Sequence, residues 1–268
     1  MNDQRPDNIH RLIVPNTSSL RGRGIYLLPN LFTSGALFAG FYAIIAAVKG
    51  HFEGASIAIL VAIVLDGLDG RIARMTNTQS DFGAEYDSLA DMVSFGIAPA
   101  LLAYQWTLHE IGKFGFFIAF LYAAGAALRL ARFNVQKTVQ DKRFFKGLPS
   151  PSAAALVATF IWFADMQGWH DLGGVIALVV LVTLSAAVLM VSNLRYYSFK
   201  DLDLRNRIPF AVVLGVVLVL GLMSIDPPLM SMLVMLAYSG SGAVLTLNQL
   251  RRSRSERRNA RAAERDAA

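Results

Sequence analysis

The chain has 268 residues, of which 54% are hydrophobic and only 16% are Asp, Glu, Lys or Arg. Soluble domains contain about 25% charged residues, so this composition excludes an ordinary soluble enzyme and also a disordered chain. The absence of cysteine excludes disulfide frameworks, cysteine-ligated metal centres and thiol nucleophiles. In a membrane protein, the net charge of +6 indicates how the chain is oriented in the bilayer, and no nucleic-acid partner is expected.

Apolar stretches long enough to cross a membrane recur along the whole chain. About 20 apolar residues span the roughly 30 Å of hydrocarbon in a bilayer. Because alternating ten-residue patterns typical of barrels are not seen, we predict an all-α, polytopic membrane bundle of about eight transmembrane helices. The predicted spans are Tyr26–Val48, Gly54–Met75, Phe82–Trp106, Phe114–Phe133, Ser150–Met166, Leu172–Asn193, Arg207–Ile225 and Pro228–Leu250.

The basic residues indicate how these spans are oriented. All but Lys49 and Lys113 of the 25 basic residues lie in the two tails, in the links after the second, fourth and sixth spans, or at adjacent helix ends. The positive-inside rule then favours an even number of spans with both termini cytoplasmic. We expect a cytoplasmic arm (residues 1–25), one membrane domain (26–250) and a basic cytoplasmic tail (251–268), in the cytoplasmic (inner) membrane.

Four aspartates interrupt the second and third spans near their cytoplasmic ends. Asp66 and Asp69 are three residues apart, and Asp87 and Asp91 are four apart, so each pair shares a helix face. A short link makes the two helices antiparallel neighbours, which brings both acidic faces to the same depth. Each carboxylate costs about 2.5–3.5 kcal/mol at mid-bilayer, and less near the interface.

Two interpretations of these acids remain open at this point. In the first, they are interfacial acids paired with Arg71 and Arg74. In the second, their oxygen atoms bind Mg²⁺, Mn²⁺ or Ca²⁺, and four carboxylates can hold two ions about 3.5–4 Å apart, as in phosphoryl transfer. The spacing of the full array, D-x-x-D-G-x-x-A-R-x8-G-x-x-x-D-x-x-x-D, favours the second.

This array resembles the signature of the CDP-alcohol phosphatidyltransferase family at all of its fixed positions, which are Asp66, Asp69, Gly70, Ala73, Arg74, Gly83, Asp87 and Asp91. The resemblance implies that the four aspartates bind two divalent ions, which hold the diphosphate of a CDP-linked lipid. It further implies that Asp91 is the general base. Gly70, Ala73, Arg74 and Gly83 are implied to contact nucleotide or phosphate.

Other stretches extend the resemblance beyond the acidic array. The segment Pro29–Thr33 is similar to the segment that opens the first span beside the nucleotide, which implies roles for Asn30 and Thr33. Ser88 and Met92, together with the stretches Arg129–Asn134 and Phe145–Ala155, resemble the serine-accepting branch of the family. The implied reaction transfers the phosphatidyl group of CDP-diacylglycerol to L-serine and releases CMP, within a homodimer surrounded by membrane lipids.

A serine acceptor requires a partner for its carboxylate. Arg129 and Arg132 are three residues apart at the cytoplasmic end of the fourth span, and either could bind this carboxylate in a bidentate manner. They could instead hold lipid phosphate or only set topology. Asn134 belongs to the same cluster.

Two other functions are weighed against serine transfer. One is a sibling enzyme of the family with another acceptor alcohol, and the other is a cation transporter that uses the acids as its ion site. The D-G-x-x-A-R context and the absence of an inverted repeat disfavour the transporter. Three tryptophans expected near the outer face, Trp106, Trp162 and Trp169, are predicted to be interfacial anchors.

Overall fold

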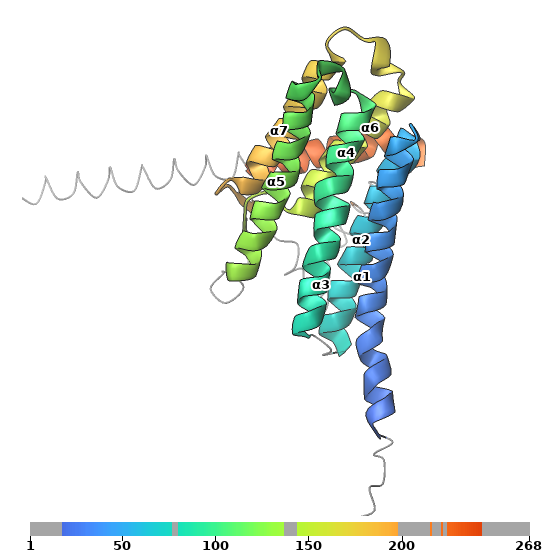
Figure 1. Cartoon of the computed structure of the whole chain (residues 1–268), viewed down its shortest axis with the longest axis vertical. Coiled ribbons are helices and arrows are strands. Elements are labelled where there is room, and N and C mark those ends of the chain that lie inside the picture. Colours follow the sequence, from blue (N-terminus) through green and yellow to red (C-terminus); the bar gives the residue numbers. More distant parts are fainter. Residues whose placement is uncertain are drawn as a thin grey trace, which may run out of the picture.

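The computed structural model describes residues 18–76, 80–136, 144–197, 215, 221 and 224–242, with most of the side chains from residue 30 onward (Figure 1). Helices dominate these residues, and most of them run side by side along one direction. The elements are α1 (Ser18–Val48), α2 (Phe52–Thr76), α3 (Asp81–Asp91), η1 (Met92–Ile97), α4 (Ala98–Trp106), η2 (Leu108–Ile111), α5 (Lys113–Gln136), β1 (Phe144–Lys146), α6 (Ser150–Met166), η3 (Trp169–Asp171), α7 (Val175–Val191) and β2 (Arg195–Tyr197).

The first six predicted spans fall on described helices. The third of them, Phe82–Trp106, is α3, η1 and α4 in succession, and η1 is a π-helical turn that periodicity did not predict. α1 begins at Ser18, earlier than the predicted span, so its helix includes the end of the predicted N-terminal arm. The seventh predicted span, Arg207–Ile225, lies almost entirely outside the described residues.

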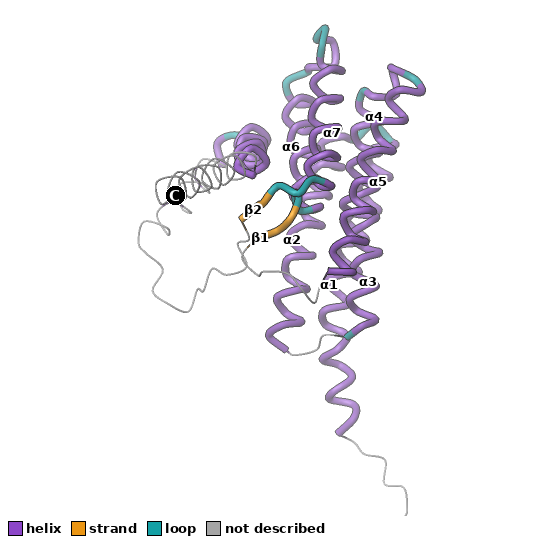
Figure 2. The backbone as a smooth tube through the Cα atoms, turned by 90° about the vertical axis from the view of Figure 1, so that its left-hand side faces the viewer, coloured by secondary structure: helices purple, strands orange, loops and turns teal. Residues whose placement is uncertain are grey.

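The eighth predicted span is described only over residues 227–242, which are helical. This helix crosses the bundle at a large angle to α1–α7, instead of running parallel to them as an eighth span would (Figures 1 and 2). Met232 is 8% exposed in the core, and Ser239 accepts a hydrogen bond from the Tyr196 hydroxyl at 3.1 Å. The segment therefore packs onto the bundle through specific contacts.

Small side chains allow the helices to approach closely. Ala43 and Ala47 of α1 and Ala55 and Ala62 of α2 are at most 1% exposed, and these two helices pack along most of their length. In membranes, helix association relies on such small residues, because lipid tails are as apolar as leucine and burial in itself gives little driving force. The close packing of α1 and α2 places the end of α2, with its aspartates, against α1.

Two three-residue strands form a small sheet that the sequence pattern did not predict. β1 pairs antiparallel with β2, with Phe145 opposite Tyr196 (Figure 2). The strands follow α5 and α7, about 50 residues apart in the chain, so no local pattern signals their pairing. The sheet connects the segment before α6 to the segment after α7.

Trp106 does not behave as the predicted interfacial anchor. Its side chain is 1% exposed, and its Nε1 donates to Asp165 Oδ1 at 2.9 Å. His170 Nε2 lies 3.2 Å from the same carboxylate oxygen, and its ring packs against Trp106 at a tilt of 53°, with ring centroids 4.7 Å apart. A buried tryptophan satisfies its N–H internally, so Trp106 belongs to the core between α4 and α6.

Two described segments are long and apolar enough to cross a membrane, Asn30–Val48 and Lys113–Val135. Ser150–Met166 and Val175–Val191 are shorter apolar helices. Large apolar side chains also face outward on these elements, including Phe38 (71% exposed) and Phe116 (63% exposed). This combination is typical of a helical membrane protein, whose outer surface is covered by lipid.

Candidate active site

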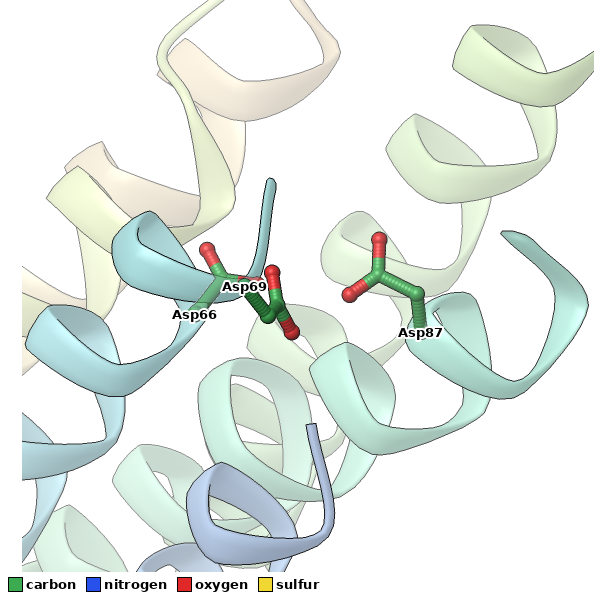
Figure 3. Close-up of side chains that lie close together, drawn as sticks. All are labelled: Asp66, Asp69 and Asp87. Atoms are coloured by element: carbon green, nitrogen blue, oxygen red, sulfur yellow. The ribbon is translucent and has the colours of Figure 1, made fainter. Parts of the chain in front are cut away.

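Three aspartates from two helices converge at one end of the bundle. Asp66 and Asp69 lie near the end of α2, and Asp87 lies on α3 and points toward them (Figure 3). One carboxylate oxygen from each residue lies within 4.8 Å of those of the other two. Asp69 is buried, and Asp66 and Asp87 are half-buried. Such a group of oxygen ligands fits a hard divalent cation.

Asp91 follows Asp87 by one helical turn and lies against Asp66. It is half-buried, its side chain hydrogen-bonds that of Asp66, and it lies within electrostatic range of Asp87 and Arg129. The three carboxylates that come within 4.8 Å of one another are those of Asp66, Asp69 and Asp87. Asp91 therefore joins this group through Asp66.

A threonine from α1 holds the buried aspartate. The Thr33 hydroxyl donates to Asp69 Oδ2 at 2.7 Å, and Thr33 is 4% exposed. A hydrogen bond to a buried carboxylate fixes its orientation and offsets part of its desolvation. Thr33, which the resemblance places beside the nucleotide, thus acts directly on a candidate metal ligand.

Asn30 and Gly83 mark a close approach of α1 to the start of α3. A Cβ atom on Gly83 would lie 3.4 Å from Asn30 Oδ1 and 3.1 Å from Ser80 Oγ. Ser80 caps α3 by accepting a hydrogen bond from the Gly83 N–H at 3.0 Å. A larger residue than glycine would therefore require the Ser80 cap to shift by a few tenths of an ångström, while its contact with Asn30 would be an ordinary one.

Arg129 on α5 lies within electrostatic range of Asp91 and Asp66. Its Nη1 donates to Ser150 Oγ at 2.6 Å, at the first residue of α6. Its Nε is buried and has no hydrogen-bond partner among the described residues. A buried N–H of a charged group is costly to leave unsatisfied, so this atom is suited to receive an anionic oxygen of a ligand.

Arg129 and Arg132 bind different partners in the structure. Arg132 Nη2 donates to Asn193 Oδ1 at 2.7 Å, next to the end of α7. Asn134 Nδ2 donates to Ser88 Oγ at 3.0 Å and so ties the end of α5 to α3. Arg129 is therefore the member of this group that the fold directs to the aspartates.

The remaining predicted residues lie on α2. Gly70 follows Asp69 and is half-buried. Ala73 and Arg74 belong to the last two turns of the helix, and their side chains lie outside the described part of the structure.

Sequence patterns missed two residues that border the site. Ser150, which binds Arg129, follows Leu148-Pro149 in the link to α6. Tyr238, on the helix of residues 227–242, interacts with Ser152 and lies within electrostatic range of Arg129. Both come from segments far along the chain, and the signal for Ser150 was the resemblance of the stretch Phe145–Ala155 to the family, which assigned no role to this serine.

An apolar groove of about 490 Å³ lies between α1 and α2. Its floor contains Ala39 and Ala58, and Phe38 and Val61 line its sides. Leu65, at one end, precedes Asp69 by four residues and shares its helix face. The groove therefore leads along the outside of the bundle to within one helical turn of the acidic cluster.

Comparisons with known proteins agree with this arrangement. A model of the CDP-alcohol phosphatidyltransferase family matches residues 26–192. The CDP-diacylglycerol–serine O-phosphatidyltransferase of Helicobacter pylori is 41% identical over 176 residues, covering 66% of this chain and 74% of that protein. Proteins of the same name from Bacillus subtilis and Methanocaldococcus jannaschii are 31% and 32% identical, over 65% and 69% of this chain and 91% and 81% of their own lengths.

The chain therefore belongs to the CDP-alcohol phosphatidyltransferase family. This family is membrane-integral and uses divalent metal ions. The matched residues include all four aspartates, Arg129 and α1 from residue 26, but not the helix of residues 227–242.

Proposed function

We propose that this chain is a CDP-diacylglycerol–serine O-phosphatidyltransferase, which makes phosphatidylserine and CMP. The observation that carries the proposal is the convergence of Asp66, Asp69 and Asp87 at the positions of the family's aspartate signature. The relatives named for this reaction, including the one 41% identical, support serine as the acceptor.

Asp66, Asp69 and Asp87, with Asp91 beside them, would hold two divalent ions, Mg²⁺ or Mn²⁺, while Ca²⁺ fits the same oxygen ligands. When bound, such ions neutralise a diphosphate and the charge of a departing phosphate. The fit rests on the donor set, since three carboxylates lie within 4.8 Å and one of them is buried. Without a cation these like charges would repel one another.

Asp91 is proposed as the general base. The serine hydroxyl oxygen attacks the phosphorus that carries diacylglycerol, the bond from that phosphorus to the CMP oxygen breaks, and CMP leaves with the electron pair. The hydroxyl proton passes to the Asp91 carboxylate. Its position between Asp66 and Arg129 supports this role, because a base must lie within hydrogen-bond reach of the proton that it accepts.

Arg129 is proposed to bind the carboxylate of serine or the phosphate of the lipid donor. Its planar guanidinium suits either group, and its buried Nε supports a ligand at this point. Arg132 and Asn134 are proposed to support the same region indirectly, since their amide and hydroxyl partners tie α5 to α7 and to α3.

The nucleotide of the donor is proposed to lie where α1, α2 and α3 meet. Asn30, Gly70, Ala73, Arg74 and Gly83 are the residues proposed to contact it. Thr33 is assigned a supporting role instead, because its hydroxyl already donates to Asp69. The closeness of Asn30 to Gly83 supports this placement, since it brings the proposed contact residues of α1 and α3 together.

The groove between α1 and α2 is proposed to receive an acyl chain of CDP-diacylglycerol. Its apolar lining and its end one turn from Asp69 support this assignment. A lipid donor must keep its chains in the bilayer while its diphosphate reaches the acids, and a groove that joins the two regions meets that need.

The proposed setting is the cytoplasmic membrane, with the acids near the cytoplasmic face and both termini on that side. The concentration of basic residues in the two tails and in the links after the second, fourth and sixth predicted spans supports this orientation. The domain limits of residues 26–250 and the homodimer implied by the family resemblance remain predictions.

The test is a reconstitution with separate acceptors. Purified protein is supplied with CDP-diacylglycerol and Mg²⁺ or Mn²⁺, and CMP release is measured with serine, glycerol 3-phosphate or inositol. We expect CMP and phosphatidylserine to form together and only with serine. CMP release that is indifferent to serine would reject the acceptor assignment, and release with another alcohol would identify a sibling enzyme.

A further inference from the structure

The helix that carries Asp87 and Asp91 contains one turn of a different kind. Residues 81–106 form one uninterrupted helix, and its π-helical turn, Met92–Ile97, begins directly after Asp91. The backbone keeps right-handed helical angles at both junctions, with φ −57° and ψ −44° at Asp91 and φ −78° and ψ −46° at Ile97. A π turn takes in one more residue than an α turn, and such turns are rare.

The extra residue changes which side chains share a face. In an unbroken α-helix, residues four, seven and eleven positions apart lie on one face, because each residue advances by about 100°. Leu89, which is 68% exposed, would then share a face with Gly96 and Ala100, which are buried. Ala90, which is 3% exposed, would share a face with Ile97, which is 36% exposed. The buried sides of α3 and α4 would therefore not be continuous.

With one residue absorbed by the π turn, positions eight apart align instead. Ala90 then takes the place in line with Ala98, and Ala90 is 3% exposed while Asp91 is half-buried beside Asp66. Leu89 takes the place in line with Ile97, and Asp91 aligns with Pro99 and Ala103, which are buried. The turn therefore keeps the buried and exposed sides of α3 and α4 continuous and sets the direction of Asp91.

Hydrogen bonds from two neighbouring helices hold the π turn. The Tyr122 hydroxyl on α5 donates to the Phe95 carbonyl oxygen at 3.2 Å, and both side chains are 0% exposed. The Ser94 hydroxyl donates to the Ala36 carbonyl oxygen on α1 at 3.1 Å. A Cβ atom on Gly40 would overlap the side chain and backbone of Ser94, so this approach of α1 to the turn requires glycine.

The same two helices carry groups that surround the acids. Ala36 follows Thr33 by one turn on α1, and Thr33 holds Asp69. Arg129 follows Tyr122 by two turns on the same face of α5. The π turn is thus joined to both sides of the acidic cluster through buried bonds.

We propose that the π-helical turn Met92–Ile97 sets the rotation of Asp87 and Asp91 into the acidic cluster, and that Tyr122 and Ser94 are positioning residues that hold this turn. The proposal deepens the proposed function, because it concerns how the acids of that site reach their positions.

A pair of one-residue changes tests the rotation directly. Deletion of Val93 removes the extra residue, so a plain α-helix would keep both faces aligned. Insertion of one alanine after Ile97 rotates α3 by about 100° relative to α4. We expect the deletion variant to keep its thermal stabilisation by Mn²⁺ alone and to lose at most about 100-fold in kcat, since the acids shift by only about an ångström along the axis. The insertion variant should lose both its thermal stabilisation by Mn²⁺ and its transferase activity.

Substitutions of the positioning residues provide a second test that does not depend on the deletion variant folding. Tyr122→Phe should lower kcat about tenfold and raise the Mn²⁺ concentration for half-maximal stabilisation several-fold, with the KM for the lipid donor within twofold. Tyr196→Phe is the matched control, because it removes a buried tyrosine–carbonyl bond of similar length, 3.1 Å to Ser239. It should lower the unfolding temperature comparably and leave kcat and the Mn²⁺ requirement within twofold.

Two results would overturn the proposal. One is a folded deletion variant that loses Mn²⁺ stabilisation as completely as the insertion variant, because the turn then does not absorb a residue. The other is an equal effect of Tyr122→Phe and Tyr196→Phe on kcat and on the Mn²⁺ requirement. A wild-type protein that fails to transfer to serine would reject the proposed function, while the Mn²⁺ comparison would still decide the role of the turn.

Discussion

The four aspartates give this chain its chemistry at the scale of single residues. Two unit negative charges 4.8 Å apart repel by about 3 kcal/mol at an effective dielectric constant of about 20. Three such carboxylates at the end of an apolar bundle are therefore unfavourable unless a cation lies among them. The bond from Thr33 to Asp69 and the nearby Arg129 reduce this cost only in part.

The proposed division of labour among the acids leads to a first prediction, on Asp91. Asp91→Asn keeps the shape of the side chain and removes the proton acceptor, so serine transfer should fall by at least about 100-fold. Binding of CDP-diacylglycerol, measured by thermal stabilisation in the presence of Mg²⁺, should remain within a few-fold of wild type. Transfer near the wild-type rate in this variant would show that Asp91 is not the base.

Thr33 supports a second prediction at the same scale. Thr33→Val preserves the shape of the side chain and removes the donor to Asp69 Oδ2, and hydrogen bonds to charged groups contribute about 1.5–3 kcal/mol. The Mn²⁺ or Mg²⁺ concentration for half-maximal activity should rise about 10–100-fold. Titration of activity against metal concentration measures this shift.

Thr159→Val is the matched control for that measurement. Thr159 is 0% exposed, and its hydroxyl donates to Ala155 O at 2.7 Å within α6, away from the acids. This variant should keep the wild-type metal requirement. Equal metal requirements in the two variants would contradict the assigned role of Thr33.

At the scale of elements, packing between α1 and α2 produces both the support for Asp69 and the groove for a lipid chain. The groove extends from Leu65 to Gly54, about 16 Å along the axis of α2. A Cβ atom on Gly54 would lie 3.9 Å from Tyr42 Oη, so a side chain fits there without a clash. The far end of the groove can therefore be closed without disturbing the acids.

Closing the groove gives the third prediction. Gly54→Leu should lower kcat/KM about tenfold for dipalmitoyl CDP-diacylglycerol, because displacing about two methylenes of a long acyl chain from the groove costs about 1.6 kcal/mol. The kcat/KM for dioctanoyl CDP-diacylglycerol should stay within twofold of the wild-type value. The substitution also favours the helix, by about 1 kcal/mol, so a stability loss should not confuse the result. Ala177→Leu, on an exposed part of α7, is the control. Equal losses for both donors would place the acyl chain elsewhere.

At the scale of the whole molecule, the distribution of charge predicts which loops share a side of the membrane. The chain has no cysteine, so single cysteines introduced by substitution can report exposure without a background. With Lys49→Cys and Thr76→Cys in intact cells, an impermeant maleimide should label the first and not the second. Labelling of both from outside the cell would contradict the predicted orientation. Permeabilised cells, in which both should react, are the control.

Periodicity and charge predicted the apolar helices of the described core well, because burial in lipid imposes long uniform apolar runs that are visible locally. Helix spacing also predicted that Asp66 and Asp69 share a face, and the short link to α3 predicted that Asp87 would meet them. The β1–β2 pair left no such pattern, and the apolar run predicted the helix of residues 227–242 but not its crosswise direction, since the partners of both lie far along the chain.

The amino-acid sequence alone therefore determined the kind of protein and its reactive acids, because lipid solvation and carboxylate chemistry depend on residue type and short spacing. Only the tertiary structure decided which groups surround those acids. Thr33 reaches Asp69 across α1 and α2, and Tyr122 holds the π turn from α5. These contacts depend on how separate helices rotate against one another, and a difference of one residue in a helical turn changes that rotation by about 100°.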